Sequence, residues 1–184
     1  IGTLSVKDYR ATVLRHSIII DLRGNTGGLL DNAVFIANMF IPKGEIVEII
    51  YRNGVKKVIN AVPNKDVVDK PIIVLVNGAS ASASEILSGA LKDTHKAKLV
   101  GKKTFGKGLV QKVVPLPNRT GLNVTVAKYL TPNGTDINKM GIKPDIEVGS
   151  DFDFYISSAS NKDLQLETAK ELLNKVESAE KSKK

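Results

Sequence analysis

The chain has 184 residues, of which 42% are hydrophobic and 25% are charged, and it contains no cysteine. This length suffices for one domain with a sizeable core, and the lack of cysteine excludes a disulfide framework, a thiol nucleophile and a cysteine metal site. The net charge of +8 comes from scattered lysines and only 5% of residues are aromatic, which argues against a nucleic-acid partner.

The first elements in chain order are two predicted strands and a helix. Residues 1–6 and 17–21 are typical of strands, and the segment between them is close to the minimum of roughly 10–12 residues for a crossover between parallel strands. Apolar residues follow a helical period through 29–41, and Pro42 ends the pattern. The sequence opens in what looks like the middle of a strand, so we expect a mature domain or a fragment.

A hairpin and a second strand–helix pair follow. Residues 45–51 and 55–62 flank the dipeptide Asn53-Gly54, a strong hairpin signal. Residues 71–76 form a continuous apolar run that predicts a strand buried on both faces, and a helix is predicted at about 83–92.

The last part of the chain predicts more β-structure, a loop and a final helix. The expected strands cover 98–101, 109–116 and 122–130, and the segment 131–150 has the composition of a loop. A helix is expected at about 164–178, with Asp163 as its cap. Strands that first alternate with helices and then form hairpins favour an α/β core built on a mixed sheet.

Three serines, Ser80, Ser82 and Ser84, stand at the predicted joint between strand 71–76 and the next helix. The unpaired N–H groups of a first helical turn can hold a negative oxygen that develops during acyl transfer. A serine at such a joint is therefore a candidate nucleophile. The common alternative is that it only caps the helix.

A nucleophilic serine needs a base, and the surroundings of His16 and His95 mark neither histidine for that role. The other candidate is Lys107, in the segment TFGKG. A lysine amine has an ordinary pKa near 10.4, and it serves as a base near pH 7–8 only where burial lowers that pKa by about three. The hypothesis therefore requires Lys107 to be buried beside Ser82 without a carboxylate partner. The alternative is a solvated lysine in a turn.

Four segments together resemble the carboxyl-terminal processing peptidases, also called tail-specific proteases, a family of serine endopeptidases. They are DLRGNTGGLL at 21–30, VNGASASASEILSGALKD at 76–93, VGKKTFGKGLVQ at 100–111 and KYLTPNGTDINKMGIKPDIEV at 128–148. Their order and spacing agree with the family across most of residues 17–148.

The resemblance implies a role for five residues. Ser82 would be the nucleophile, Lys107 its base and Gln111 the residue that orients the amine. The backbone N–H groups of Gly28 and Ala83 would form the oxyanion hole. The resemblance implies no metal and no cofactor.

Neighbouring residues have supporting roles in this interpretation. Asp21 and Arg23 are expected to stabilise the glycine loop rather than to react, and Asp93 is interpreted as structural. Ser80 and Ser84 are expected to shape the turn and to cap the helix. Contact between Lys107 and Gln111 requires a bend in the chain, which Gly108 would permit.

The resemblance also implies the fold class, a ClpP/crotonase-type serine peptidase core with a mixed β-sheet and flanking helices. We expect a peptidase core at 1–150 and a C-terminal helical segment with a basic tail at 151–184. The PDZ module usual in the family is not recognisable, and the link between Val6 and Ser17 is shorter than the family's crossover.

The predicted function is a serine endopeptidase that cleaves in the C-terminal region of protein substrates with apolar tails, outside the cytoplasm of a bacterium. A membrane anchor upstream of this sequence and a homo-oligomer are left open. One alternative is a non-catalytic binding or scaffold module on the same fold. Another is a crotonase-like enzyme acting on acyl groups, against which the TFGKG segment argues.

Overall fold

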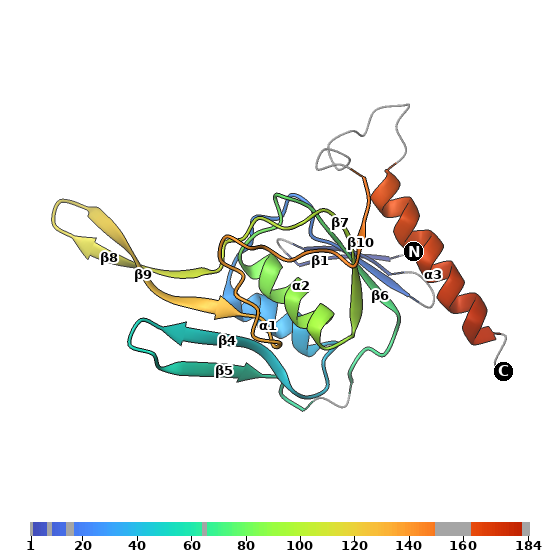
Figure 1. The fold of residues 1–184 in the computed structure, drawn as a ribbon, viewed down its shortest axis with the longest axis horizontal. Helices are drawn as coiled ribbons and strands as arrows, with labels where there is room; N and C mark the ends of the chain where they lie inside the picture. The colour runs from blue at the N-terminus through green and yellow to red at the C-terminus, as the bar shows by residue number, and fades with distance from the viewer. Residues whose placement is uncertain (1, 7–8, 14–16, 64–65, 150–162, 182–184) are drawn as a thin grey trace.

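The computed structural model describes residues 2–6, 9–13, 17–63, 66–149 and 163–181. Within this part of the chain, two β-sheets and three α-helices are arranged in layers, as Figure 1 shows.

The larger sheet has the strand order β1-β2-β3-β6-β7-β10. Its strands are β1 (Gly2–Val6), β2 (Tyr9–Val13), β3 (Ile18–Asp21), β6 (Ile72–Val76), β7 (Ala97–Gly101) and β10 (Ile146–Glu147). The four strands from β3 to β10 are parallel, whereas β2 is antiparallel to β1 and to β3. Every residue of β6 is buried, which confirms the prediction of a strand covered on both faces.

The start of the chain differs from the expectation. The segment between the two predicted strands contains β2, which pairs antiparallel with β3 and places Val13 opposite Ile18. Antiparallel neighbours need only a tight connection, so no crossover has to fit between them. The prediction of a parallel crossover between residues 1–6 and 17–21 is therefore wrong.

The smaller sheet is antiparallel and has the strand order β5-β4-β9-β8. Its strands are β4 (Glu45–Tyr51), β5 (Lys56–Asn60), β8 (Leu109–Leu116) and β9 (Thr120–Leu130). The predicted hairpin at Asn53-Gly54 is confirmed, because β4 and β5 pair on either side of it. The far ends of β8 and β9 extend away from the body as an arm (Figure 1).

Helices α1 (Leu30–Asn38) and α2 (Ala83–Asp93) pack against each other between the two sheets (Figure 1). The main hydrophobic core joins Val74 of β6, Leu87 of α2 and Ile46 of β4, all with no exposed surface. This core holds the two helices and both sheets in one unit.

Helix α3 (Leu164–Lys181) covers the opposite face of the larger sheet. Ala169 and Leu173 pack against Ile73 and Leu75 of β6. The helix confirms the prediction for 164–178, and the expected cap at Asp163 is also present, since its carboxylate accepts a hydrogen bond from the N–H of Leu166 at 3.0 Å. The predicted loop at 131–150 is mainly irregular but contains the short strand β10.

Acid should loosen the attachment of α3. Burial alone would raise the pKa of Asp163, but hydrogen bonds from Arg23 and Leu166 outweigh burial and hold that pKa below its ordinary value of 3.8. The ionised carboxylate therefore stabilises the folded chain above about pH 4, and this contribution is lost as the pH falls through the lowered pKa.

We expect Asp163→Asn to melt at a lower temperature than the parent chain at pH 6. The difference should shrink as the pH falls below about 4 and through the lowered pKa of Asp163, where the parent also loses the charge. Thermal melts over this range measure it, and a difference that stayed constant with pH would contradict the account.

Candidate active site

The carboxyl ends of the parallel strands β3, β6 and β7 lie at one edge of the larger sheet. The segments that follow them carry the glycine loop at 22–28, the serines at 80–84 and Lys107. Loops at this edge are the usual location of binding and catalytic residues in parallel sheets. The topology thus brings together the three segments that the sequence marked as separate motifs.

Ser82 is the N-cap residue of α2, directly before its first turn, and has φ 57° and ψ −117°. A residue with a side chain rarely adopts this backbone conformation, which costs on the order of 1–3 kcal/mol. Ser82 is half-buried, and its neighbours Ala81 and Ala83 are buried. The turn therefore presents the hydroxyl group of Ser82 at the N-terminus of a helix.

The two other serines have different roles. The hydroxyl group of Ser80 donates to the carbonyl of Leu22 at 2.7 Å and accepts from the N–H of Asn77 at 3.0 Å, so Ser80 shapes the turn as predicted. Ser84 is buried, and its hydroxyl group has no hydrogen-bond partner in the described part of the chain. The prediction that Ser84 caps the helix is wrong, because α2 begins one residue earlier.

Glu85, in the first turn of α2, is completely buried and binds two segments of the site. Its carboxylate accepts from the N–H of Ser82 at 2.9 Å and from the hydroxyl group of Thr104 at 2.5 Å. It also accepts from the N–H groups of Gly106 at 2.7 Å and Lys107 at 2.8 Å. A carboxylate has acceptor sites for all of these donors, so the buried group is well satisfied.

The same oxygen of Glu85, Oε2, accepts from the N–H groups of both Ser82 and Lys107. Their backbone nitrogens are therefore separated by no more than the combined length of two hydrogen bonds. A second link between the segments is the bond from the N–H of Phe105 to the carbonyl of Ser80, at 3.0 Å. The turn of Ser82 and the loop of Lys107 are thus held side by side.

The sequence did not reveal the full role of Glu85. A glutamate three residues after the N-cap serine is the pattern of a capping box, which accounts for the bond to the N–H of Ser82. The donors in Thr104, Gly106 and Lys107 lie a strand and a loop further along the chain, and no local pattern points to them.

The exposure of Lys107 differs from the expectation. Its backbone is fixed by Glu85, but the residue as a whole is exposed rather than buried. Its amine has no hydrogen bond or ion pair with the part of the chain that the structure describes, so the requirement for a site without a carboxylate partner is met there. Of the two conditions that the hypothesis sets for Lys107, the lack of a carboxylate partner is therefore met among the described residues, and burial is not.

Gln111 lies in β8 and is also exposed. A register shift between Val110 and Gln111 marks a bulge in the pairing of β8 with β9. The irregularity in this part of the chain therefore lies at Gln111 and not at Gly108, the residue that was expected from the sequence to permit a bend. A Cβ atom on Gly108 would lie 2.4 Å from the backbone nitrogen of Asn138, so Gly108 serves close packing of two backbones.

The glycine loop fits tightly against the turn of Ser82. Gly27 has φ +104°, and a Cβ atom there would lie 2.8 Å from the Cβ of Ser82 and 2.9 Å from the backbone nitrogen of Ala83. The adjacent Gly28 is exposed, and in the described residues neither its N–H nor that of Ala83 donates to a protein acceptor. Two backbone donors thus remain available beside Ser82.

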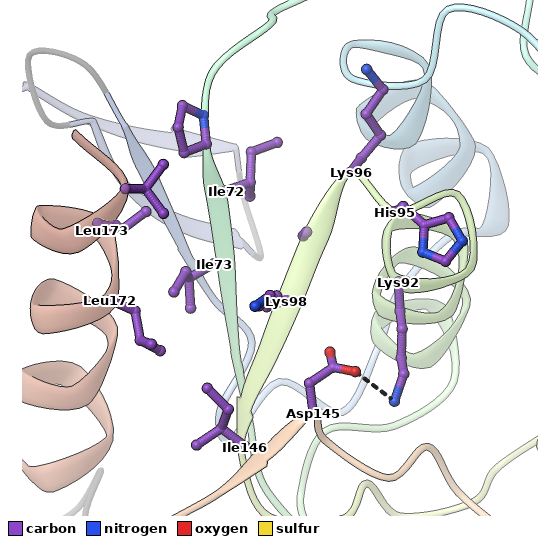
Figure 2. Close-up of a pocket in the computed structure, with 13 residues that line it drawn as sticks. Ile72, Ile73, Lys92, His95, Lys96, Lys98, Asp145, Ile146, Leu172 and Leu173 are labelled. Carbon is purple, nitrogen blue, oxygen red and sulfur yellow. Dashed lines mark ion pairs between the residues drawn. The ribbon is translucent and has the colours of Figure 1, made fainter. Parts of the chain in front are cut away.

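His95 lies at the opposite end of α2 from Ser82, and eleven residues of helix span roughly 16 Å. Figure 2 shows His95 with Lys92, Lys96 and Lys98 around a pocket of about 530 Å³. The pocket lies where β6 and β7 begin, so it is separate from the edge that carries Ser82. His16 lies outside the described residues.

The supporting acidic residues behave as structural groups. Asp21 pairs with Arg23 at 2.8 Å, and Asp93 accepts from the N–H of Asn133 at 3.0 Å.

Among the described residues, no group of histidine and acidic side chains has an arrangement that could hold a metal ion. A search of the same residues for a helix long and apolar enough to cross a membrane also found none.

Fold and site together define an α/β protein with a mixed-sheet core and a serine in a strained strand-to-helix turn beside the loop of Lys107. Comparison with family models identifies a match to "Peptidase family S41" over residues 7–148. The chain therefore belongs to peptidase family S41, and the expected fold class, the mixed-sheet core of this family, is confirmed.

The relatives that this chain resembles are longer proteins. It is 48% identical to a carboxyl-terminal-processing protease of Picosynechococcus sp. over 84% of this chain and 37% of the relative. It is 45% identical to the carboxy-terminal processing protease CtpA of Bacillus subtilis, over 70% of this chain and 28% of that protein. The solved photosystem II D1 C-terminal processing protease matches with a TM-score of 0.68 and 44% identity, over 72% of this chain and 34% of that one.

The fit of Gly27 can be tested with a matched pair of glycines. Gly27→Ala should destabilise the chain by on the order of 1–3 kcal/mol from overpacking, in addition to the backbone strain, because its methyl group meets the turn of Ser82. Gly44 has nearly the same φ, +103°, but open space around it. Gly44→Ala should therefore incur only the strain of a side chain at positive φ, without the overpacking.

Denaturant unfolding of both variants measures the difference. Gly27→Ala should be the less stable of the two. Equal losses of stability would contradict the close contact between the loop and the turn.

Replacing Glu85 should loosen both segments that it binds. Glu85→Gln keeps the shape but turns one acceptor atom into a donor that faces N–H groups, which should cost about 1–3 kcal/mol for each donor left unsatisfied. Glu167→Gln is the control, because Glu167 is exposed and pairs only with Lys170 at the surface. Urea unfolding should show a large loss for the first variant and almost none for the second. Similar curves for both would refute the role of Glu85.

Proposed function

We propose that this chain is the catalytic core of a serine endopeptidase in which Ser82 is the nucleophile and Lys107 the general base. The observation that carries the proposal is the shared oxygen of Glu85, which holds the backbone of both residues within two hydrogen bonds of each other. The membership of the chain in peptidase family S41 supports hydrolysis of peptide bonds as the class of reaction. Because the chain spans about a third of the length of its relatives, the activity of the isolated core is part of the proposal.

In the proposed reaction, the hydroxyl oxygen of Ser82 attacks a peptide carbonyl carbon while its proton passes to the neutral amine of Lys107. The carbonyl oxygen becomes an oxyanion as the new C–O bond forms. Collapse of this intermediate breaks the peptide C–N bond, and the Lys107 ammonium gives its proton to the leaving amine. Water then hydrolyses the acyl-enzyme, with Lys107 again taking a proton.

The N–H groups of Gly28 and Ala83 would bind the oxyanion. Both lie beside Ser82, both lack protein acceptors among the described residues, and Ala83 stands in the first turn of α2. Donors that are already in place when charge develops contribute the most to acyl transfer. Loss of one such donor typically lowers turnover by about 10²–10³-fold.

The exposed position of Lys107 requires that the substrate itself exclude water. Three apolar residues adjacent in the chain to segments of the site, or to Gly141, which packs against Gly106, have most of their surface exposed: Leu29 at 70%, Phe105 at 65% and Met140 at 64%. A peptide lying over Ser82 would contact these side chains and cover Lys107, and removal of an amine from water favours its neutral form. Gln111 would then orient the amine from the base of β8.

The substrates under this proposal are unfolded or loosely structured protein tails with apolar ends. An extended tail can enter an open edge of the sheet, and the exposed apolar groups around Ser82 favour apolar residues in it. The names of the relatives refer to C-terminal processing. We further propose that the protein works outside the bacterial cytoplasm. Two of the relatives, one from Tetradesmus obliquus and one from Arabidopsis thaliana, are chloroplastic by name.

One observation favours a second candidate function. Because Lys107 is exposed, the core without further segments is a candidate for a non-catalytic protein-binding module whose site is latent. Incubation of this chain with an unfolded protein such as reduced casein separates the two functions, since a latent module binds the protein without producing fragments.

Substitution at the two reacting groups gives the sharpest test. Ser82→Ala and Lys107→Ala should each lower the rate of casein cleavage by roughly a thousandfold or more, because each removes a group that acts in the transition state. The thermal melt of each variant should stay close to that of the parent. Lys103→Ala is the matched control, since Lys103 is an exposed lysine in the same segment and should be dispensable. A rate retained by Lys107→Ala would overturn the Ser–Lys mechanism.

A further inference from the structure

Arg23 joins the glycine loop of the site to helix α3. Only 5% of the residue is exposed, and its guanidinium group donates to Asp21 at 2.8 and 2.9 Å. It also donates to both carboxylate oxygens of Asp163, at 2.8 and 2.9 Å, and to the side-chain oxygen of Gln165 at 3.2 Å. One buried cation therefore connects residues that lie 140 positions apart in the chain.

The same carboxylate of Asp163 both binds Arg23 and begins α3. Its Oδ1 atom accepts from the N–H of Leu166 at 3.0 Å, and its backbone carbonyl accepts from the N–H of Glu167 at 2.9 Å. The position of the helix start is thus coupled to the position of the guanidinium group. Further along α3, Glu177 accepts a hydrogen bond from the buried Ser17 at 3.0 Å, so the helix is attached at two points.

At its other end, Arg23 stands in the stem of the loop that carries Gly27 and Gly28. The side of this stem that faces α2 is held by Asn77, which accepts from the N–H of Gly24 at 3.0 Å, and by Ser80, which donates to the carbonyl of Leu22 at 2.7 Å. The side that faces α3 is held by Arg23. The loop is therefore held on one side by the turn that leads from β6 into α2 and on the other by the start of α3.

Helix α3 lies outside the residues that match the family model, which end at 148. The match to the family model therefore does not cover Asp163 or the rest of α3. The bidentate arrangement on two carboxylates also requires arginine, because a lysine amine is a single point charge without the planar fork.

We propose that α3 positions the oxyanion donor of the active site through Arg23, so that docking of Asp163 on Arg23 keeps the loop at 22–28 in its working conformation. Arg23 and Asp163 are positioning residues in this account, since neither touches the reacting atoms. Release of the N-terminus of α3 loosens the loop and lowers turnover. This inference rests on the proposed function of Gly28, but the coupling of helix to loop can be measured without any activity.

The experiment compares the 184-residue chain carrying Asp163→Asn or Arg23→Lys with the parent chain by hydrogen–deuterium exchange and by steady-state kinetics. In both variants, exchange of the amides of the loop at 22–28 should accelerate by a larger factor than exchange of those of β4, at 45–51, which report only the change in global stability. Turnover, kcat, should fall by roughly tenfold or more with little change in KM, because an oxyanion donor acts in the transition state. Glu171→Gln is the control, as it removes a carboxylate from an exposed position of α3.

Loop exchange at the parent rate in both variants would overturn the proposal, whatever the kinetics. An acceleration as large in β4 as in the loop would also overturn it, because that result indicates general destabilisation rather than a specific link. If the parent chain has no peptidase activity, the proposed function fails on its own account, and the exchange data still decide whether α3 controls the loop.

Discussion

The arrangement of this site depends on one buried carboxylate. Glu85 accepts hydrogen bonds from the turn of Ser82 and from the loop of Thr104, Gly106 and Lys107, which come from opposite ends of a helix–strand unit. A buried carboxylate is costly unless it is fully hydrogen-bonded, so the two segments and Glu85 fix one another. The frame of parallel strands brings these segments to one edge of the sheet, and Glu85, together with the hydrogen bond from the N–H of Phe105 to the carbonyl of Ser80, sets their spacing. The strained backbone of Ser82 is stable in this setting because its N–H group is held by the same carboxylate.

Three elements thus contribute to one proposed reaction centre from different directions. Helix α2 presents Ser82 and the N–H of Ala83, and the loop after β7 presents Lys107. The glycine loop after β3 presents Gly28 through the close contact of Gly27 with the turn. Arg23 extends this arrangement to α3 on the far face of the sheet. Lys107 itself is exposed to solvent in this arrangement.

The features that sequence could predict are those set by local patterns. The apolar run of β6, the periodic helices and the turn at Asn53-Gly54 were all predicted correctly, because period, length and turn residues determine them. The candidate site residues came from motifs whose order agreed with a family, and the structure places Ser82 and Lys107 side by side. Local patterns could not show that β2 pairs antiparallel with β3, since the length of the segment allowed either connection. The contacts of Glu85 and Arg23 were hidden because their partners are distant in the chain, and the exposure of Lys107 depends on packing that no single motif encodes.

The most direct measurement is a crystal structure of Ser82→Ala with a peptide of apolar C-terminal sequence bound over the site. The account predicts that the Lys107 amine lies covered by the peptide and within about 3 Å of the position that the serine hydroxyl would occupy, with no carboxylate in contact. It also predicts the peptide carbonyl oxygen at the N–H groups of Gly28 and Ala83. An amine that remained in solvent with the peptide in place, or that paired with an acidic side chain, would contradict the central claim.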